Sequence, residues 1–296
     1  MQLNALIKRN SKLFFKDKGM FFTSLITPII LLVLYISFLA KVYKDVFIGL
    51  LPQGAVIDEK LINGAVSGQL LSSLLAVSCV TVAFCSNLLM VNDKVNGAIK
   101  DLTMTPVKSS LLSLSYFLSS ALVTLLICLT AFFVGLIYIG VMGWYLTFLD
   151  IILLIGDIIL LVLFGTALSS LINSRLSTAG QASAVGTIVS SGYGFICGAY
   201  MPISSFPELL QKIISFLPGT YGTALLRNHY LRGVYAEMLD KGYGEDAVQN
   251  IKSGIDCNIY FFDKQVEIPY MYLALICSVT VITLLYIAVC MGKRKT

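Results

Sequence analysis

The feature that most constrains this chain is a series of long apolar stretches, separated by short connections that hold most of the charged residues. Each stretch is close to or above the roughly 20 residues that a helix needs to cross a ~30 Å hydrocarbon core. The stretches cover residues 20–40, 65–91, 110–140, 148–172, 178–200 and 269–291. Because lipid offers no partner for backbone N–H and C=O groups, such stretches fold as helices. The sequence therefore predicts an all-α membrane protein with six transmembrane helices.

The composition agrees with a bilayer as the solvent. Of the 296 residues, 57% are hydrophobic and only 12% are charged, and the mean hydropathy is +0.86. Soluble domains carry about 25% charged residues, so this chain has too few to cover a soluble globule. The net charge of +5 is spread over the connections, whereas nucleic-acid binding needs a basic face. We predict a single transmembrane domain over residues 1–296 and no nucleic-acid partner.

The distribution of Lys and Arg predicts the orientation. If both termini lie on one side, the connections on that side are residues 1–19, 92–109, 173–177 and 292–296. They hold twelve of the 21 Lys and Arg residues in fewer than 50 positions. The positive-inside rule then places both termini in the cytoplasm. Aromatic residues such as Trp144 and Tyr270 stand at the opposite ends of the spans, as expected of an interfacial belt.

The N-terminal segment is amphipathic. Its apolar residues share one helical face, and Lys and Arg border that face; the apolar residues are Leu3, Leu6, Ile7, Leu13 and Phe14. Such a pattern is typical of a helix that lies in the membrane interface. We predict an amphipathic helix within residues 1–19 that contacts lipid of the cytoplasmic leaflet.

A second amphipathic segment, residues 205–217, is too short to cross and is followed by Pro218 and Gly219. We predict that residues 202–230 form an outer re-entrant helical hairpin between the fifth and sixth spans. This hairpin belongs to an external region over residues 201–268. Its last part, residues 235–268, is polar, and the sequence predicts no particular fold there.

The sequence lacks the motifs of catalytic and metal sites. It has no GxxxxGK[ST] phosphate loop, no GxSxG, no paired intramembrane carboxylates and no Cys or His pattern suited to zinc. We therefore expect no enzyme activity, cofactor or metal in this chain. His229 and Cys257 are expected to be ordinary loop residues.

The fifth stretch is rich in small residues. They form a stripe along one helical face: Gly180, Ala184, Thr187, Ser191, Gly194 and Gly198. Small residues let helix backbones approach closely in lipid. One interpretation is helix packing alone. The other is a translocation path or dimer interface that also includes Gln181 and Tyr193.

Asp157 stands in the middle of the fourth stretch. A carboxylate facing lipid there would cost at least about 2–3 kcal/mol, so it must face protein or water. It is either a contact for substrate or ions or a hydrogen-bonded structural residue. Asp150, near the outer end of the same stretch, is expected to be solvated.

The connection over residues 92–109 carries a motif. Asp93 is followed by Gly97, then by Leu102 and by Thr105-Pro106-Val107. Gly97 permits a turn, and Pro106 ends the short helix that follows it. This order resembles the signature of ABC-2 type permeases, the membrane subunits of ABC exporters. The order of the other elements along nearly the whole chain is also similar to that family.

The resemblance implies a coupling role for this connection. The matching residues are Asp93, Gly97, Ile99, Lys100, Asp101, Leu102, Thr105 and Pro106. Lys100 departs from the family pattern, because many members carry Glu there. By this resemblance, the coupling segment receives movement from separate ATPase subunits.

The resemblance further implies two cytosolic ABC ATPase subunits that bind ATP and Mg²⁺, and a second permease that is identical or related. It implies a multi-pass protein of the plasma membrane of a bacterium. The expected cargo is amphipathic, such as a drug, an antimicrobial peptide or a lipid-like molecule, as in the drug and peptide exporter branch.

Two alternatives remain open. The same fold could export a glycan or teichoic-acid polymer. A secondary transporter driven by ions would be expected to show inverted repeats and several buried charged groups, whereas this sequence shows no evident repeat.

Overall fold

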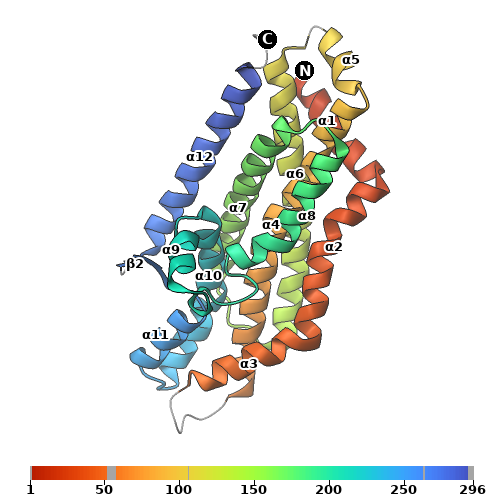
Figure 1. Ribbon diagram of the computed structural model, residues 1–296. Helices are drawn as coiled ribbons and strands as arrows, with labels where there is room; N and C mark the ends of the chain where they lie inside the picture. Colours follow the sequence, from red (N-terminus) through yellow and green to blue (C-terminus); the bar gives the residue numbers. More distant parts are fainter. Residues whose placement is uncertain (1, 52–57, 106, 263, 293–296) are drawn as a thin grey trace.

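The long helices of the chain run side by side as a bundle. The computed structural model describes residues 2–51, 58–105, 107–262 and 264–292. Helices α1 (Gln2–Lys16) and α5 (Ala98–Met104) lie at the same end as the last turn of α12 (Ile268–Gly292) (Figure 1). We call this the terminal end. The distal end holds α3 (Ala40–Gly49) and α11 (Glu245–Gly254).

Within the described residues, five helical segments are long and apolar enough to cross a membrane. They are Lys18–Gly49, Glu59–Val95, Ser109–Met142, Phe148–Arg175 and Ile268–Cys290. The first joins α2 (Lys18–Leu34), the short π-helix η1 (Tyr35–Leu39) and α3, and the others are α4, α6, α7 and α12. They correspond to predicted spans one to four and six. The prediction of a helical, multi-span membrane protein is confirmed.

The predicted fifth span is α8 (Ala179–Ile196), which has 18 residues. Its mean hydropathy is too low for it to count among the five apolar segments, because small and polar residues make up much of its length. The count of six spans therefore stays a prediction.

Helix α4 (Glu59–Val95) is the centre of the bundle. It contacts α2, α3, α6 (Ser109–Met142), α7 (Phe148–Arg175), α8 and α10, and it is almost wholly buried. Its hydroxyl side chains donate to carbonyl groups of the same helix, as Ser78 does to Leu74 (2.7 Å). Asn87 instead donates to Ser169 and Ser170 of α7 (3.0 and 2.6 Å). These bonds satisfy buried hydroxyl groups of α4 and the side-chain N–H groups of Asn87, whereas Oδ1 of Asn87 has no partner among the described residues.

The external region has more structure than the sequence predicts. It holds the 3-10 turn η2 (Ile203–Ser205), α9 (Glu208–Ser215), α10 (Pro218–Asp240), α11 and a hairpin of β1 (Ile259–Phe261) and β2 (Lys264–Val266). In this antiparallel hairpin Tyr260 lies opposite Gln265. The all-α prediction is therefore incomplete by one small hairpin.

The boundary of the predicted outer hairpin at residue 230 is wrong, because α10 continues to Asp240. Two polar residues of this segment, Arg227 and His229, lie within α10. Both side chains are buried and paired with acidic residues, so the helix packs against α4, α7 and α12 despite them.

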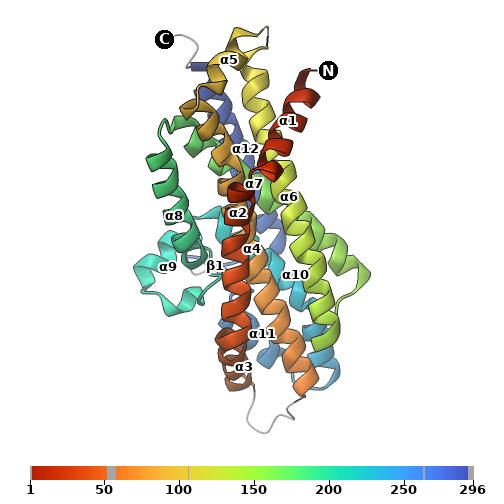
Figure 2. The same ribbon diagram turned by 90° about the vertical axis from the view of Figure 1, so that its right-hand side faces the viewer.

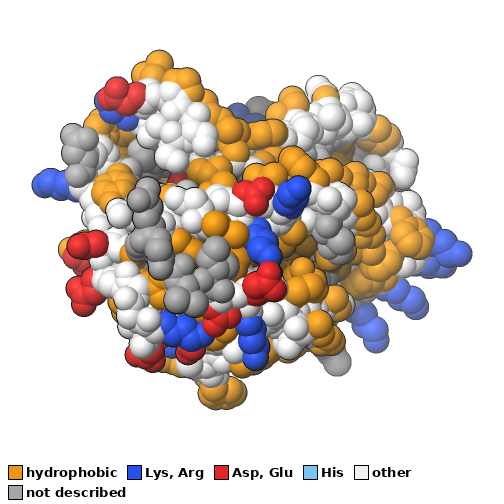
Figure 3. Space-filling model, turned by 90° about the horizontal axis from the view of Figure 1, so that it is seen from below, with side chains coloured by type: hydrophobic (Ala, Val, Ile, Leu, Met, Phe, Trp, Pro, Cys, Tyr) orange, Lys and Arg blue, Asp and Glu red, His pale blue; other side chains and the backbone are white. Residues whose placement is uncertain are grey.

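The surface of the distal end mixes both signs of charge, with Asp and Glu beside Lys and Arg (Figure 3). Lys241 donates to Asp58 and forms an ion pair with Glu237 (3.2 Å). The hydrogen bond from Lys241 lowers the pKa of the Asp58 carboxyl. Asp58 also caps α4 by accepting from the backbone of Lys60 and Leu61.

Gly165 marks the closest approach of α7 to α4. A Cβ at this position would lie 2.7 Å from the carbonyl oxygen of Cys79 and 2.9 Å from Cα of Val80. We predict that Gly165→Leu separates the two helices, costs about 1–3 kcal/mol of stability and lowers the Tm in detergent by several degrees. Gly156→Leu, on the same helix, is the matched control, because a Cβ added at Gly156 would have nothing within 4 Å. Equal Tm values for the two variants would contradict this account of the packing.

Candidate functional site

Helix α5 is the exposed element of the terminal end. Gly97 begins it with φ +80°, a left-handed conformation that favours glycine. Ile99 and Leu102 pack against an apolar platform, which consists of Leu6, Leu89, Met90, Leu112 and Tyr116. The helix therefore rests on α1, α4 and α6 by its apolar face.

The other face of α5 is free for a partner. Lys100 and Asp101 are exposed, and Met104 is 85% exposed. The Thr105 hydroxyl donates to the carbonyl of Leu102 and closes the last turn (2.6 Å). Pro106, which the sequence assigns to the same element, lies outside the described residues.

Asp93 has a different position from the rest of the predicted coupling residues. It is buried, and its carboxylate accepts from Arg9 of α1 (2.8 Å) and from Tyr116 of α6 (2.5 Å). Hydrogen bonds to a charged group are among the stronger ones in proteins. In this structure Asp93 holds α1 and α6 to α4 and fixes the platform beneath α5.

Lys94, the next residue, binds the other side of the bundle. Its ammonium group donates to the carbonyl oxygens of Asn173, Ser174 and Leu176 (3.0, 2.8 and 3.0 Å). These carbonyls lie at the C-terminal end of α7, where the helix dipole makes a cation favourable. The sequence did not single out Lys94, because its partners are about 80 positions away along the chain.

We predict that Asp93→Asn loosens α1. The substitution leaves Arg9 without its charged partner, so hydrogen exchange of the α1 amides should rise at least about fivefold, with α12 unchanged. Asp101→Asn is the control, since this carboxylate is exposed on α5. Exchange measured by mass spectrometry that stays equal in both variants would contradict the anchoring role.

A groove of about 920 Å³ runs between α2 and α8, with α4 at its base. The two helices stand apart on this side of α4 (Figure 2). One wall comes from α2 and η1 and is mainly apolar, with Ile26, Ile30, Leu34 and Phe38, although Thr23 and Thr27 of α2 also line it. The other wall carries hydroxyl groups from α8: Ser183, Thr187, Ser190 and Ser191. The groove is therefore amphipathic across its width.

The predicted path residues divide into two groups. Thr187 and Ser191 line the groove. Gln181 lies in the first turn of α8, and its side chain accepts from the backbone N–H of Ser177 (3.0 Å), while Thr178 is the N-cap. Tyr193 and Gly194 are buried.

Two glycines shape the chain at the C-terminal end of α8, Gly194 within the helix and Gly198 just after it. A Cβ on Gly194 would collide with the ring of Tyr200. Gly198 turns the chain at φ +70°, and its carbonyl accepts from Arg227 (2.5 Å). These positions form the end of α8, and only the middle of the stripe faces the groove.

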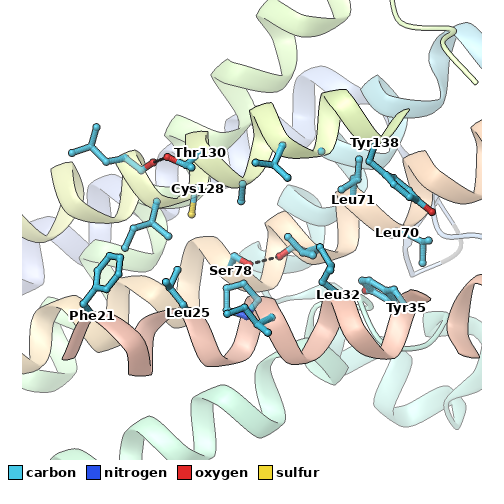
Figure 4. A pocket seen from close by; sticks show the side chains of 18 of the residues that line it. Phe21, Leu25, Leu32, Tyr35, Leu70, Leu71, Ser78, Cys128, Thr130 and Tyr138 are labelled. Atoms are coloured by element: carbon cyan, nitrogen blue, oxygen red, sulfur yellow. Dashed lines mark hydrogen bonds between the residues drawn. The ribbon is translucent and has the colours of Figure 1, made fainter. Parts of the chain in front are cut away.

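A second cavity, of about 500 Å³, lies between α2, α4 and α6 (Figure 4). Its lining is almost wholly apolar. The hydroxyls of Ser78 and Thr130 already donate to Leu74 and Leu126 of their own helices. Tyr35 lines this cavity and the groove, so it stands between the two.

Asp157 lies in a buried cluster away from both cavities. Its Oδ2 pairs with Nδ1 of His229 on α10 (2.6 Å), and its Oδ1 accepts from the hydroxyl of Tyr272 on α12 (2.5 Å). The prediction that Asp157 faces protein agrees with this position. The prediction that His229 is a loop residue is wrong, because His229 lies in α10. Its carboxylate partner is on another helix, and the sequence alone does not show that contact.

The prediction for Asp150 is also wrong, whereas Cys257 lies in a loop as expected. Asp150 is buried and not solvated: it accepts from the backbone and hydroxyl of Thr147 and pairs with Arg232 (2.6 Å). Cys257 is buried as well, and burial raises the pKa of its thiol to about 11.

Arg227 ties the distal loops together. It is 2% exposed and donates to the carbonyls of Gly198 and Ile255, to Asp256 (3.4 Å) and to Ser73 of α4 (3.2 Å). Burial raises the pKa of the Asp256 carboxyl, and the charge of Arg227 offsets part of that shift. The guanidinium thus joins α10 to α4 and to the turn after α8.

We predict that Tyr272→Phe destabilises the protein by about 1–3 kcal/mol, because it leaves a buried carboxylate oxygen of Asp157 without its donor. Tyr270→Phe removes the same atom from an exposed residue two positions earlier and should have little effect. Thermal unfolding in detergent compares the two. A Tm for Tyr272→Phe equal to that of the control would show that the cluster adds little stability.

The family model of the ABC-2 type transporter matches residues 1–231. The chain belongs to this family and is a multi-pass permease subunit of an ABC transporter. A comparison with curated proteins gave no match. The family match ends within α10, so α11 and the β hairpin lie beyond it.

Proposed function

We propose that this chain is the permease of an ATP-driven exporter that moves an amphipathic molecule, such as a drug, a peptide or a lipid-like compound, across a bacterial plasma membrane. Two permeases, identical or related, work with two cytosolic ATPase subunits that bind ATP and Mg²⁺. The observation that carries this proposal is the α2–α8 groove, which has one apolar wall and one hydroxyl-bearing wall. Family membership supports the type of partner.

In this proposal the terminal end lies in the cytoplasm. The excess of Lys and Arg in its connections supports that orientation. Helix α8 is then a short fifth span of about 27 Å, and α9 lies at the outer membrane surface as part of a re-entrant hairpin. The exposed apolar residues of α9, such as Leu209 at 74%, support contact with lipid.

Coupling begins at α5. Closure of the ATPases moves α5, and its contacts through Ile99 and Leu102 transmit the movement to the platform. Asp93 and Lys94 pass it to α1, α6 and the connection that leads into α8. The groove must bind cargo differently in the two states for ATP hydrolysis to drive transport.

The groove is also the face on which we place the second permease. Helix α8 leaves large apolar side chains uncovered on and beside the groove, including Phe195 of the lining at 47% exposure and Ile188 at 69%. A second copy against α2 and α8 covers these side chains and encloses a path between the two subunits.

Crosslinking tests the assignment of α5. We predict that Met104→Cys, on the exposed face of α5, captures an ABC ATPase subunit with a thiol crosslinker in native membranes, with a yield that changes when ATP is added. Leu209→Cys at the opposite end is the control and should capture none. Loss of the ATPase band from Met104→Cys, or its appearance with Leu209→Cys, would overturn the proposed function.

A further inference from the structure

Gln69 is a buried amide in the wall of the α2–α8 groove. It is 4% exposed and lines the groove from α4. Its Oε1 has no hydrogen-bond partner among the described residues. A buried polar group without a partner costs about 1–3 kcal/mol, so such groups are rare in folded proteins. An unpaired amide on a cavity wall is a position where a ligand can supply the missing bond.

A second buried polar group lines the same groove from η1. Tyr35 is 3% exposed, and its hydroxyl lies near Ser73 of α4 but makes no hydrogen bond of normal geometry among the described residues. Tyr43 lines the groove as well, but its hydroxyl already donates to the carbonyl of Ala199 (3.3 Å). Among the described residues that line the groove, Gln69 and Tyr35 are therefore the two with a buried polar atom that lacks a hydrogen bond.

The depth of this position follows from neighbouring contacts. Gly64 of α4 packs against Tyr145, at the distal ends of α6 and α7. Gln69 is five residues further along α4, about 7.5 Å toward the terminal end. The amide thus lies in the distal part of the groove, about one helical turn beyond Ser73, which meets Arg227.

The groove is uncharged. None of the described residues that line it is Asp, Glu, Lys or Arg. Arg227 is not part of the lining and already binds four acceptors. A charged ligand group would lose its hydration without gaining a counter-charge, which is costly in an apolar surrounding.

We propose that Gln69 and Tyr35 form a subsite for an uncharged hydroxyl or amide group of an amphipathic cargo. This inference rests on the proposed function and names the chemical class of the cargo. The amide of Gln69 and the phenol of Tyr35 can each donate and accept hydrogen bonds. A hydroxyl or amide group on the cargo has the same capacity and can therefore bond to both. The alkyl part lies on the α2 wall, and further hydroxyls meet the free lone pairs of Thr187 and Ser191. The volume of about 920 Å³ suits a ligand of drug size.

The test uses the full chain in lipid nanodiscs, without ATPase or nucleotide. Four photoreactive probes share one dodecyl diazirine chain and carry a glucoside, a phosphate, a trimethylammonium or no head group. Mass spectrometry measures labelling of α2, α4 and α8. We expect the glucoside to label the groove at least about fivefold more than either charged probe. A fivefold difference in binding corresponds to the free energy of about one net hydrogen bond.

Substitutions locate the subsite. Gln69→Leu should reduce glucoside labelling about fivefold and leave labelling by the headless probe unchanged, which a general loss of structure would not do. Tyr35→Phe should lower glucoside labelling in the same direction, and it serves as the test if Gln69→Leu does not fold. Gln69→Glu should shift the preference toward the trimethylammonium probe. Gln249→Leu on α11, away from the groove, is the matched control and should change nothing.

Two results would overturn the proposal: equal labelling by the glucoside and phosphate probes, or unchanged glucoside labelling in both Gln69→Leu and Tyr35→Phe. Because the assay contains no ATPase, either result would leave the coupling of α5 to an ATPase standing. Failure of the Met104→Cys crosslink would, in turn, leave the probe results unaffected.

Discussion

The burial of α4 is the constraint on which the rest of the structure depends. A helix surrounded by other helices must satisfy every polar group without water. Small side chains and hydroxyls bonded to their own backbone let α4 do so along most of its length. The exceptions include Asn87, which bonds to α7, and Ser73, which meets Arg227. Asp93 and Lys94 at one end hold neighbouring helices, and Oε1 of Gln69 stays unpaired in the groove.

The sequence predicts the helices that depend on local pattern. The five long spans follow from apolar length, and α5 follows from Gly97, which begins it in a left-handed conformation. The sequence also predicts that Asp157 faces protein or water and not lipid, because an ionised carboxylate facing lipid is costly. These features are set by residues close together along the chain.

The parts that the sequence misses depend on residues far apart in the chain. His229 and Arg227 make α10 look polar, and only their acidic partners on α7 and in the distal loop explain their burial. Asp150 meets Arg232 in the same way. The groove joins a wall of α2 to a wall of α8, more than 140 positions apart, so neither amphipathic face alone could reveal it.

The length of α4 has a mechanical consequence. Gln69 and Asp93 are separated by 24 residues of continuous helix, or about 36 Å. A rod of that length acts as a lever, and each degree of tilt displaces one end relative to the other by about 0.6 Å. Swinging of this single rod can therefore convert a small push at its inner tip into an opening or narrowing of the crevice at its outer part.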